Sequence, residues 1–278
     1  MTEVTEPRTV LHPTRIEPHN RLVVLARSIQ VSDSEGERAL VHEVRRWQRF
    51  GNACLGRALY RHRSIFQNAT DAPVWSHLEL SYFREMIPAS VISQLVPNRE
   101  SHDVTLLRAE ILLTTPSSFI LPHGWEGSAS HPERVASLEY IKVQSNHLRD
   151  YRLTMRDYCG PAALKLIERE RLGTFRAMET AVVLFHAPPL TTDWNQIHLC
   201  ELDPNGFEGF GKEFAAALRI GLPNGGGSPD CFADLGRIRT VPRWTFNDFV
   251  VEADSGVGRE YEDASWPAAL AHHPLGTG

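Results

Sequence analysis

The order of apolar and polar positions predicts two similar series of elements along the chain. In the first series, an apolar run is followed by a segment with apolar side chains near helical spacing, which Gly56 can close. Two β-like runs joined by turn residues then indicate a hairpin, and a helix and a last strand follow it. The predicted elements are a strand over 22–31, a helix over 36–56, strands over 57–67 and 74–83, a helix over 85–95 and a strand over 103–115.

The same order recurs after a stretch that is rich in Pro, Gly and Ser. Its predicted elements are a strand over 137–144, a helix over 147–171, strands over 174–186 and 194–202, and a helix over 207–222. The long helix is expected to kink at Gly160-Pro161, because proline cannot donate the backbone hydrogen bond there. The two series repeat with a period of about 115–120 residues, and such a period outweighs any local assignment of secondary structure.

Each series predicts a four-stranded antiparallel sheet with both helices on one face, which is the ferredoxin-like βαββαβ unit. The other face of each sheet is left open. Two units can pack these faces together, which avoids exposing a large apolar surface. We therefore predict an α+β protein in which two tandem ferredoxin-like repeats pack into one α+β barrel, with an irregular C-terminal extension.

Changes in composition along the chain predict the domain boundaries. Residues 1–21 are polar and carry several prolines, so we expect an N-terminal arm. The first repeat is predicted over 22–115, a connector over 116–136 and the second repeat over 137–222. Residues 223–278 begin with a Gly-rich hinge and are dense in aromatic side chains, so they are expected to wrap over a domain or a cavity mouth.

Composition narrows the class of protein. The chain has 278 residues, of which 42% are hydrophobic and 23% charged, values typical of a folded globular protein. The net charge of −5 argues against binding to nucleic acid, and the longest apolar runs are too short to span a membrane. No secretory signal is visible. These observations predict a cytoplasmic protein with a small-molecule substrate, and they leave open whether it pairs into a homodimer through exposed strand edges.

The cysteines give no sign of a metal centre or a disulfide scaffold, because they are scattered and include no CxxC pair. They are Cys54, Cys159, Cys200 and Cys231. In the connector, His123, Glu126 and His131 have a spacing that fits no established ligand pattern, and a solvated loop explains them better. We therefore expect no metal site.

The clearest chemical signal lies on the hairpin strand of each repeat. Alternate side chains of a strand point to opposite faces. In 74–83 we assign Leu78 and Leu80 to the face under the helices, and we assign the alternate set to the open face of the sheet. That set is Trp75, His77, Glu79 and Phe83. In 194–202 the same reasoning places Trp194 and His198 on the open face, so each repeat carries a Trp and a His there.

Neighbouring strands add polar groups to this face. Tyr60 and His62 alternate along 57–67, and Arg108 and Glu110 alternate along 103–115. A cavity with such a mixture of aromatic and ionisable side chains is typical of small-molecule sites.

Roles for these residues follow from their chemistry. A His near a Glu can act as a general acid or base, because the carboxylate fixes the tautomer of the imidazole. We predict His77 as the base and Glu79 as the group that orients it, with Tyr60, His62 or Arg108 as the donor to an oxyanion. The predicted substrate contacts are Trp75, Phe83, Glu110, Trp194 and His198. The alternative for each His is an ordinary half-buried residue that hydrogen-bonds its neighbours.

The layout resembles the dimeric α+β barrel superfamily in a fused two-repeat form. This superfamily includes antibiotic-biosynthesis monooxygenases, polyketide cyclases and NIPSNAP-like proteins. In the second repeat, residues 138–155 look like the opening strand and helix of the unit. Asn195 and His198 look like the Asn-x-x-x-His pair of NIPSNAP-like sequences, with one residue fewer between them. The resemblance covers the architecture of residues 22–222.

The resemblance implies three kinds of function, because this fold supports several chemistries. The first is an enzyme without a cofactor, in which a His base acts on a small apolar or aromatic, polyketide-like substrate as a monooxygenase, cyclase or lyase. The second is a haem enzyme similar to chlorite dismutases and aldoxime dehydratases, with His198 or His147 as axial ligand. The third is a non-catalytic module that binds a small ligand or supports assembly. We expect the first of these, with its site in the first repeat, which carries more ionisable groups.

Overall fold

The computed structural model describes residues 14–15, 21–46, 54–68, 75–96, 103–122, 125, 127–203, 209–220 and 231–253. Its strands are β1 (Thr14–Arg15), β2 (Val23–Val31), β3 (Cys54–Asn68), β4 (His77–Phe83), β5 (Val104–Leu121), β6 (Val135–Val143), β7 (Thr174–His186), β8 (Gln196–Leu202) and β9 (Arg239–Ala253). Its α-helices are α1 (Ser34–Arg45), α2 (Ala89–Leu95), α3 (Leu148–Thr154), α4 (Gly160–Glu168), α5 (Phe210–Ile220) and α6 (Cys231–Ile238). Short 3-10 turns occupy Ser128–Ser130 and Ser145–His147, and a π-helical turn, Met155–Cys159, joins α3 to α4.

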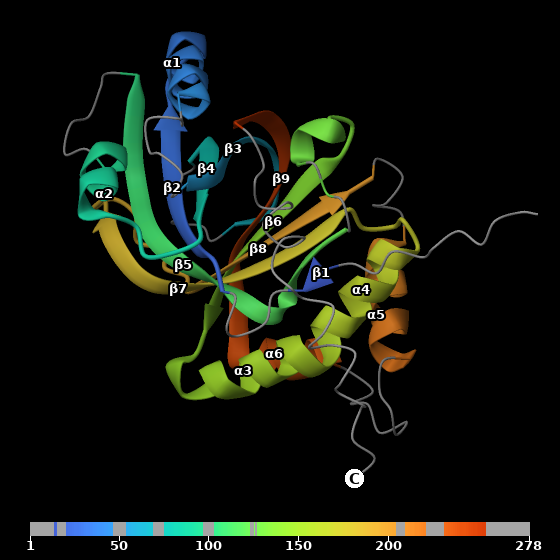
Figure 1. Cartoon of the computed structure of the whole chain (residues 1–278). Coiled ribbons are helices and arrows are strands. Elements are labelled where there is room, and N and C mark those ends of the chain that lie inside the picture. The colour runs from blue at the N-terminus through green and yellow to red at the C-terminus, as the bar shows by residue number, and fades with distance from the viewer. Residues whose placement is uncertain are drawn as a thin grey trace, which may run out of the picture.

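Two four-stranded sheets of the same design close into a barrel (Figure 1). The first sheet has the order β5-β2-β4-β3 and the second has the order β9-β6-β8-β7, with all neighbours antiparallel. The strands β3 and β9 pair at one seam, and β5 and β7 pair at the other. The predicted α+β barrel of two tandem ferredoxin-like repeats is therefore confirmed.

The last strand of the second repeat lies where the sequence analysis expected an irregular extension. Strand β9 fills the gap between β3 and β6 and so supplies the eighth strand of the barrel. Its buried side chains include Arg243, Thr245 and Asn247, whereas the alternate positions Trp244 and Phe246 are half-buried on the outer face. The expectation of an irregular segment was wrong here because polar groups occupy the inward positions and reverse the usual alternation.

The first helix is shorter than its apolar spacing predicted. Helix α1 begins at the Asp33 cap, whose Oδ1 accepts hydrogen bonds from the backbone N–H groups of Glu35 (2.9 Å) and Gly36 (2.8 Å). It ends at Arg45, so the prediction that it continues to Gly56 was wrong. Leu55 instead lies in β3, where its side chain joins the core of the barrel.

The long helix of the second repeat is irregular close to the predicted kink. The π-helical turn Met155–Cys159 directly precedes Gly160, and the Ser118 hydroxyl on β5 donates a 2.9 Å hydrogen bond to the carbonyl of Met155. Gly160 packs so closely on β5 that a Cβ there would lie 2.1 Å from the carbonyl oxygen of Ser117. The helix is therefore anchored to the sheet at this point.

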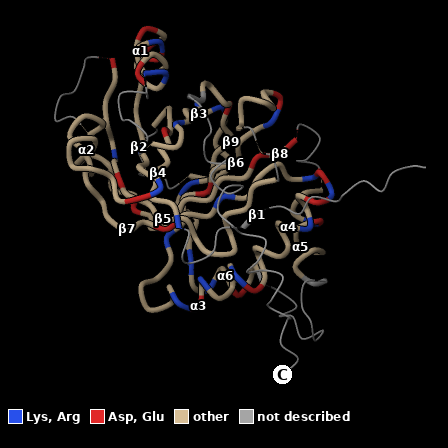
Figure 2. Tube along the Cα trace, in the orientation of Figure 1, with Lys and Arg blue, Asp and Glu red and all other residues tan. Residues whose placement is uncertain are grey.

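Two layers of core result from this arrangement. The interior of the barrel is lined by aliphatic and aromatic side chains from both repeats, among them Leu80, Leu112, Leu138 and Leu199. Helices α1 and α2 cover the outer face of the first sheet, and α3 to α6 lie on the side of the second (Figure 1). Charged residues of both signs occur on the strands as well as on the helices (Figure 2). In the part of the chain that the structure describes, no helix is long and apolar enough to cross a membrane.

Candidate functional site

The hairpin strands face the opposite way from the prediction. Leu78, Leu80 and Tyr82 belong to the interior of the barrel, and Ile197 and Leu199 do the same in the second repeat. The expectation that Trp75 and Trp194 share a face with His77 and His198 was wrong, because both indoles precede their strands and lie inside the barrel. Within the strands the alternation was predicted correctly, but the assignment of its two sets to the two faces was wrong. The physical reason is that closing the barrel creates the larger apolar core, so the aliphatic set lies inside it and the polar set lies beneath the helices.

Glu79 lies at the centre of a buried ion cluster beneath α1, and not in a cavity. Its two carboxylate oxygens accept hydrogen bonds from Arg27 Nε at 3.0 Å and from Arg57 Nε at 2.9 Å. Glu43 of α1 also pairs with both guanidinium groups. Burial would raise the pKa of Glu79, but Arg27 and Arg57 outweigh that effect and lower it to about 2. These charges fill the interface, which is a structural role.

The other predicted groups of the first hairpin are also enclosed beneath helices. His77 is 3% exposed and lies between the Ser76 hydroxyl, 2.8 Å from Nδ1, and the Glu37 carboxylate, 3.2 Å from Nε2. Burial lowers the pKa of His77, and Glu37 opposes that effect. Phe83 packs in the apolar cluster that includes Val91 of α2. The structure therefore does not bring His77, Glu79 and Phe83 together with the residues of the barrel interior.

The interior of the barrel does bring several predicted residues together. The rings of Trp75 and Trp194 lie 5.1 Å apart, and the Arg108 guanidinium lies 4.0 Å from the centre of the Trp194 ring. Glu110 accepts a 2.7 Å hydrogen bond from Trp194 Nε1 and pairs with Arg108 at 2.9 Å. Arg243 lies over the Trp75 ring at 3.6 Å. The result is a packed stack in which two adjacent indole rings lie between two guanidinium groups.

Two further predicted residues lie on β3. The hydroxyl of Tyr60 accepts a 3.3 Å hydrogen bond from Arg176 Nη1 inside the barrel. His62 is half-buried, and its pKa is lowered first by burial and then by the nearby charge of Arg243. Both are separated from His77, which lies on the other face of the sheet.

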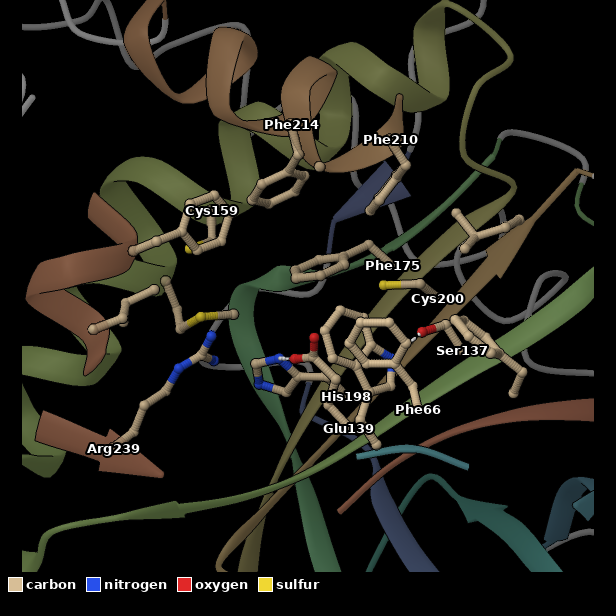
Figure 3. Close-up of a pocket in the computed structure, with 17 residues that line it drawn as sticks. Phe66, Ser137, Glu139, Cys159, Phe175, His198, Cys200, Phe210, Phe214 and Arg239 are labelled. Carbon is tan, nitrogen blue, oxygen red and sulfur yellow. Dashed lines mark hydrogen bonds and ion pairs between the residues drawn. The ribbon is translucent and has the colours of Figure 1, made fainter. Parts of the chain in front are cut away.

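A cavity of about 340 Å³ lies in the second repeat, outside the barrel (Figure 3). It is bounded by the outer face of β6 to β9 on one side and by the π-helical turn, α5 and α6 on the other. Its lining is mostly apolar, with aromatic side chains at Phe66, Phe175, Phe210, Phe214, Phe232, Trp244 and Phe246. Phe66 and Phe232 are 63% and 43% exposed, so the cavity lining reaches the surface at these residues. Its volume falls within the range of small-molecule sites.

Neighbouring polar groups connect one wall of this cavity to the buried Tyr151 behind it. Arg239 Nη1 donates to the hydroxyl of Tyr151 at 3.4 Å, and that hydroxyl lies 3.0 Å from Nε2 of His198. Nδ1 of His198 is 3.9 Å from a carboxylate oxygen of Glu139. Figure 3 shows the His198 ring beside Glu139, with Arg239 at the edge of the same space. The cavity wall thus presents the imidazole of His198 and the carboxyl group of Glu139, and the phenol of Tyr151 lies behind His198, outside the lining.

Burial is the main influence on the pKa values of His198, Tyr151 and Glu139. It lowers the pKa of His198 to about 3, and the charge of Arg239 adds to that effect. Burial raises the pKa of Tyr151 and of Glu139, and in both cases Arg239 opposes the rise. At neutral pH the imidazole of His198 is neutral and the phenol of Tyr151 keeps its proton.

Sequence reasoning found His198 and missed its partners. Glu139 could have been found, because it alternates with the apolar residues of its strand. Tyr151 gave no separate signal, because an aromatic residue on a predicted helix indicates only a position in the hydrophobic core. Arg239 begins the strand that the sequence analysis did not predict.

The remaining candidate ligands lie elsewhere. His147 is not among the residues that line the cavity, and its Nδ1 lies 3.2 Å from Asp150. His123 and Glu126 fall outside the described residues, and His131 lies on the surface, 3.5 Å from Glu133. The described ranges contain no group of three His, Cys, Asp or Glu residues that could hold a metal ion.

Comparisons with known proteins support the fold. No family model matches the chain, and no curated protein matches it in sequence. An anthrone oxidase-like protein superposes with a TM-score of 0.51 at 11% identity, over 88% of this chain and 98% of its own. A putative chlorite dismutase gives 0.47 at 8% identity, over 87% and 98%. A chlorite dismutase variant from Candidatus Nitrospira defluvii in complex with cyanide gives 0.46 at 12% identity, over 86% and 95%.

These neighbours correct one expectation. Several of them are chlorite dismutases, the class that the resemblance described above associates with haem. The expectation of a site without a cofactor conflicts with these neighbours and is not carried further. What the chain has in common with these structures is the barrel of two ferredoxin-like repeats.

Proposed function

We propose that the cavity of the second repeat binds haem and that the protein is a haem enzyme of the fused-barrel type. One observation carries the proposal: a buried imidazole, His198, lines an aromatic cavity that opens to the surface. Neutral imidazole is the commonest protein ligand of haem iron. The proposal moves the site from the first repeat, where His77 is enclosed beneath α1, to the second.

The donor set and the lining of the cavity fit this group. The imidazole of His198 is neutral at pH 7, as a metal ligand must be, and it has a carboxyl group near its other nitrogen, an arrangement that is common around metal-binding histidines. The sulfur atoms of Met155 and Cys159 line the opposite, helical side, and both are known types of haem ligand. An apolar macrocycle suits the aromatic walls.

The one arginine among the described residues of the cavity lining suits the charged edge of haem. The guanidinium of Arg239 can bind a carboxylate through two parallel hydrogen bonds. We assign it to a haem propionate. When bound, haem would supply redox chemistry at its iron, while the protein supplies the ligand, the charge of Arg239 and the apolar walls that exclude water.

A haemin titration tests the proposal. The absorbance of the purified protein is recorded from 300 to 700 nm while haemin is added. We expect a sharp band near 400 nm that saturates at about one haem per chain and is lost in His198→Ala. His147→Ala is the matched control and should bind as the wild type does, because His147 does not line the cavity.

Two results would contradict the proposal. The first is a titration that does not saturate in the wild type. The second is unchanged binding in His198→Ala with binding lost in Met155→Ala or Cys159→Ala, which would assign the ligand to the helix. Far-UV circular dichroism and thermal unfolding of each variant show that a loss of binding is not a loss of fold.

A second candidate function is the binding of an aromatic substrate directly in this cavity. The observation that favours it is the density of aromatic side chains around Trp244 at the mouth, where Phe66 lies 4.6 Å from the indole ring. Because Trp244 lines the cavity, its fluorescence reports occupancy. Saturable quenching by polycyclic phenols, without uptake of haemin, would favour this function over the first. The absence of such quenching in the wild type would exclude it.

A further inference from the structure

The hydroxyl of Tyr151 occupies the nitrogen of His198 that would otherwise be available to a ligand. Tyr151 is fully buried on α3 and His198 is 4% exposed on β8. Their rings are stacked with centres 6.1 Å apart, and the phenol oxygen lies 3.0 Å from Nε2. This distance is that of a good hydrogen bond.

The direction of this hydrogen bond follows from the contact that Arg239 makes with Tyr151. A guanidinium can only donate, so Arg239 Nη1 uses a lone pair of the Tyr151 oxygen. The hydroxyl proton then points to the acceptor that lies within reach, which is Nε2 of His198. A neutral imidazole has one lone pair, so its proton must be on Nδ1, the nitrogen that faces Glu139.

We propose that Tyr151 is a latch on His198: its hydroxyl fixes the Nδ1–H tautomer and holds the lone pair of Nε2 until an incoming ligand displaces it. The latch regulates the site described under Proposed function and rests on that proposal for the identity of the ligand. Tyr151 is thus a positioning residue that acts through His198. Removing its hydroxyl leaves the lone pair of Nε2 without a competitor, and Glu139 remains as the neighbour of Nδ1.

The first test needs no haem. The protein is labelled with 15N-histidine, and the signals of His198 are assigned by their loss in His198→Gln. At pH 7 we expect the wild type to show a protonated Nδ1 and a hydrogen-bonded, unprotonated Nε2. In Tyr151→Phe the Nε2 signal should shift toward that of a free lone pair. Tyr158→Phe removes the hydroxyl of another tyrosine, in the π-helical turn that follows α3, and should leave the signal unchanged. A protonated Nε2 in the wild type would overturn the latch.

The second test measures the consequence for binding. The net value of one neutral hydrogen bond corresponds to a change of about three- to tenfold in affinity, so Tyr151→Phe should bind haemin more tightly than the wild type by about that factor. Equal affinities would overturn the latch while leaving haem binding intact. If neither protein takes up haemin, the proposed function fails, and the tautomer of His198 still decides whether the latch exists.

Discussion

The sheet–helix interfaces of the two repeats share the same strand pairing but differ in the side chains that lie between sheet and helices. Arg27 pairs with Glu79 across β2 and β4, and at the matching place in the second repeat Glu139 pairs with His198 across β6 and β8. In the first interface these side chains form a close ion pair beneath α1. In the second they lie 3.9 Å apart beside a cavity.

A third matched position explains why one interface is filled and the other is hollow. Arg57 lies opposite Ser81 in the first repeat, and Phe175 lies opposite Cys200 in the second. The long Arg57 side chain reaches Glu79 and Glu43 and fills the space beneath α1, whereas Phe175 packs against Phe214 of α5 and leaves room beside His198. The comparison teaches that a duplicated fold can use one copy of an interface for stability and keep the other for a ligand.

The largest expected effect comes from removing the central carboxylate of the filled interface. Glu79→Leu leaves Arg27 and Arg57 buried beside each other with only the partly exposed Glu43 to compensate them. We expect a loss of about 3–5 kcal/mol in the free energy of unfolding, measured by urea denaturation. His198→Leu, the same change at the matching position, should cost about 1 kcal/mol, the value of one neutral hydrogen bond. Equal losses would show that the two interfaces do not differ in this way.

Acid should weaken the filled interface through the same residue. The pKa of Glu79 is lowered to about 2 in the folded protein from an ordinary value of 4.5. Its contribution to stability is therefore complete above pH 4.5 and is lost as the pH falls toward 2. This shift corresponds to about 3 kcal/mol.

Glu79→Gln isolates this contribution from those of other carboxylates. The difference in unfolding free energy between the wild type and this variant, measured by urea denaturation at each pH, should shrink between pH 4.5 and 2. A difference that stays constant over this range would contradict the assignment.

The smallest effects should come from adding bulk at matched positions. Ser81 is fully buried against Glu79, so Ser81→Phe should overpack the first interface and cost about 1–3 kcal/mol. Cys200 lines the cavity, so Cys200→Phe has room and should change stability by less than about 1 kcal/mol while it abolishes uptake of haemin. Thermal unfolding and the haemin titration of both variants provide the measurements. A Cys200→Phe protein that still binds haemin would place the site elsewhere.

The sequence by itself determined the architecture. The recurrence of strand, helix, hairpin, helix and strand depends on local periodicity, and local periodicity is visible in a single chain. It also singled out His198, Trp75 and Trp194, but it placed each Trp on the same face as a His, and the structure separates them. The two indole rings do meet inside the barrel.

Only the tertiary structure decided which face of each sheet carries the aliphatic side chains and which carries the polar ones. Leu78 and His77 alternate in the same way whether the helices or the barrel cover the aliphatic side, and the closing of the barrel through β9 made the interior the larger apolar core. The cavity depends on contacts between residues far apart in the chain, such as Tyr151 with His198 and Arg239. No spacing along the sequence encodes such contacts, because side-chain packing across elements fixes them.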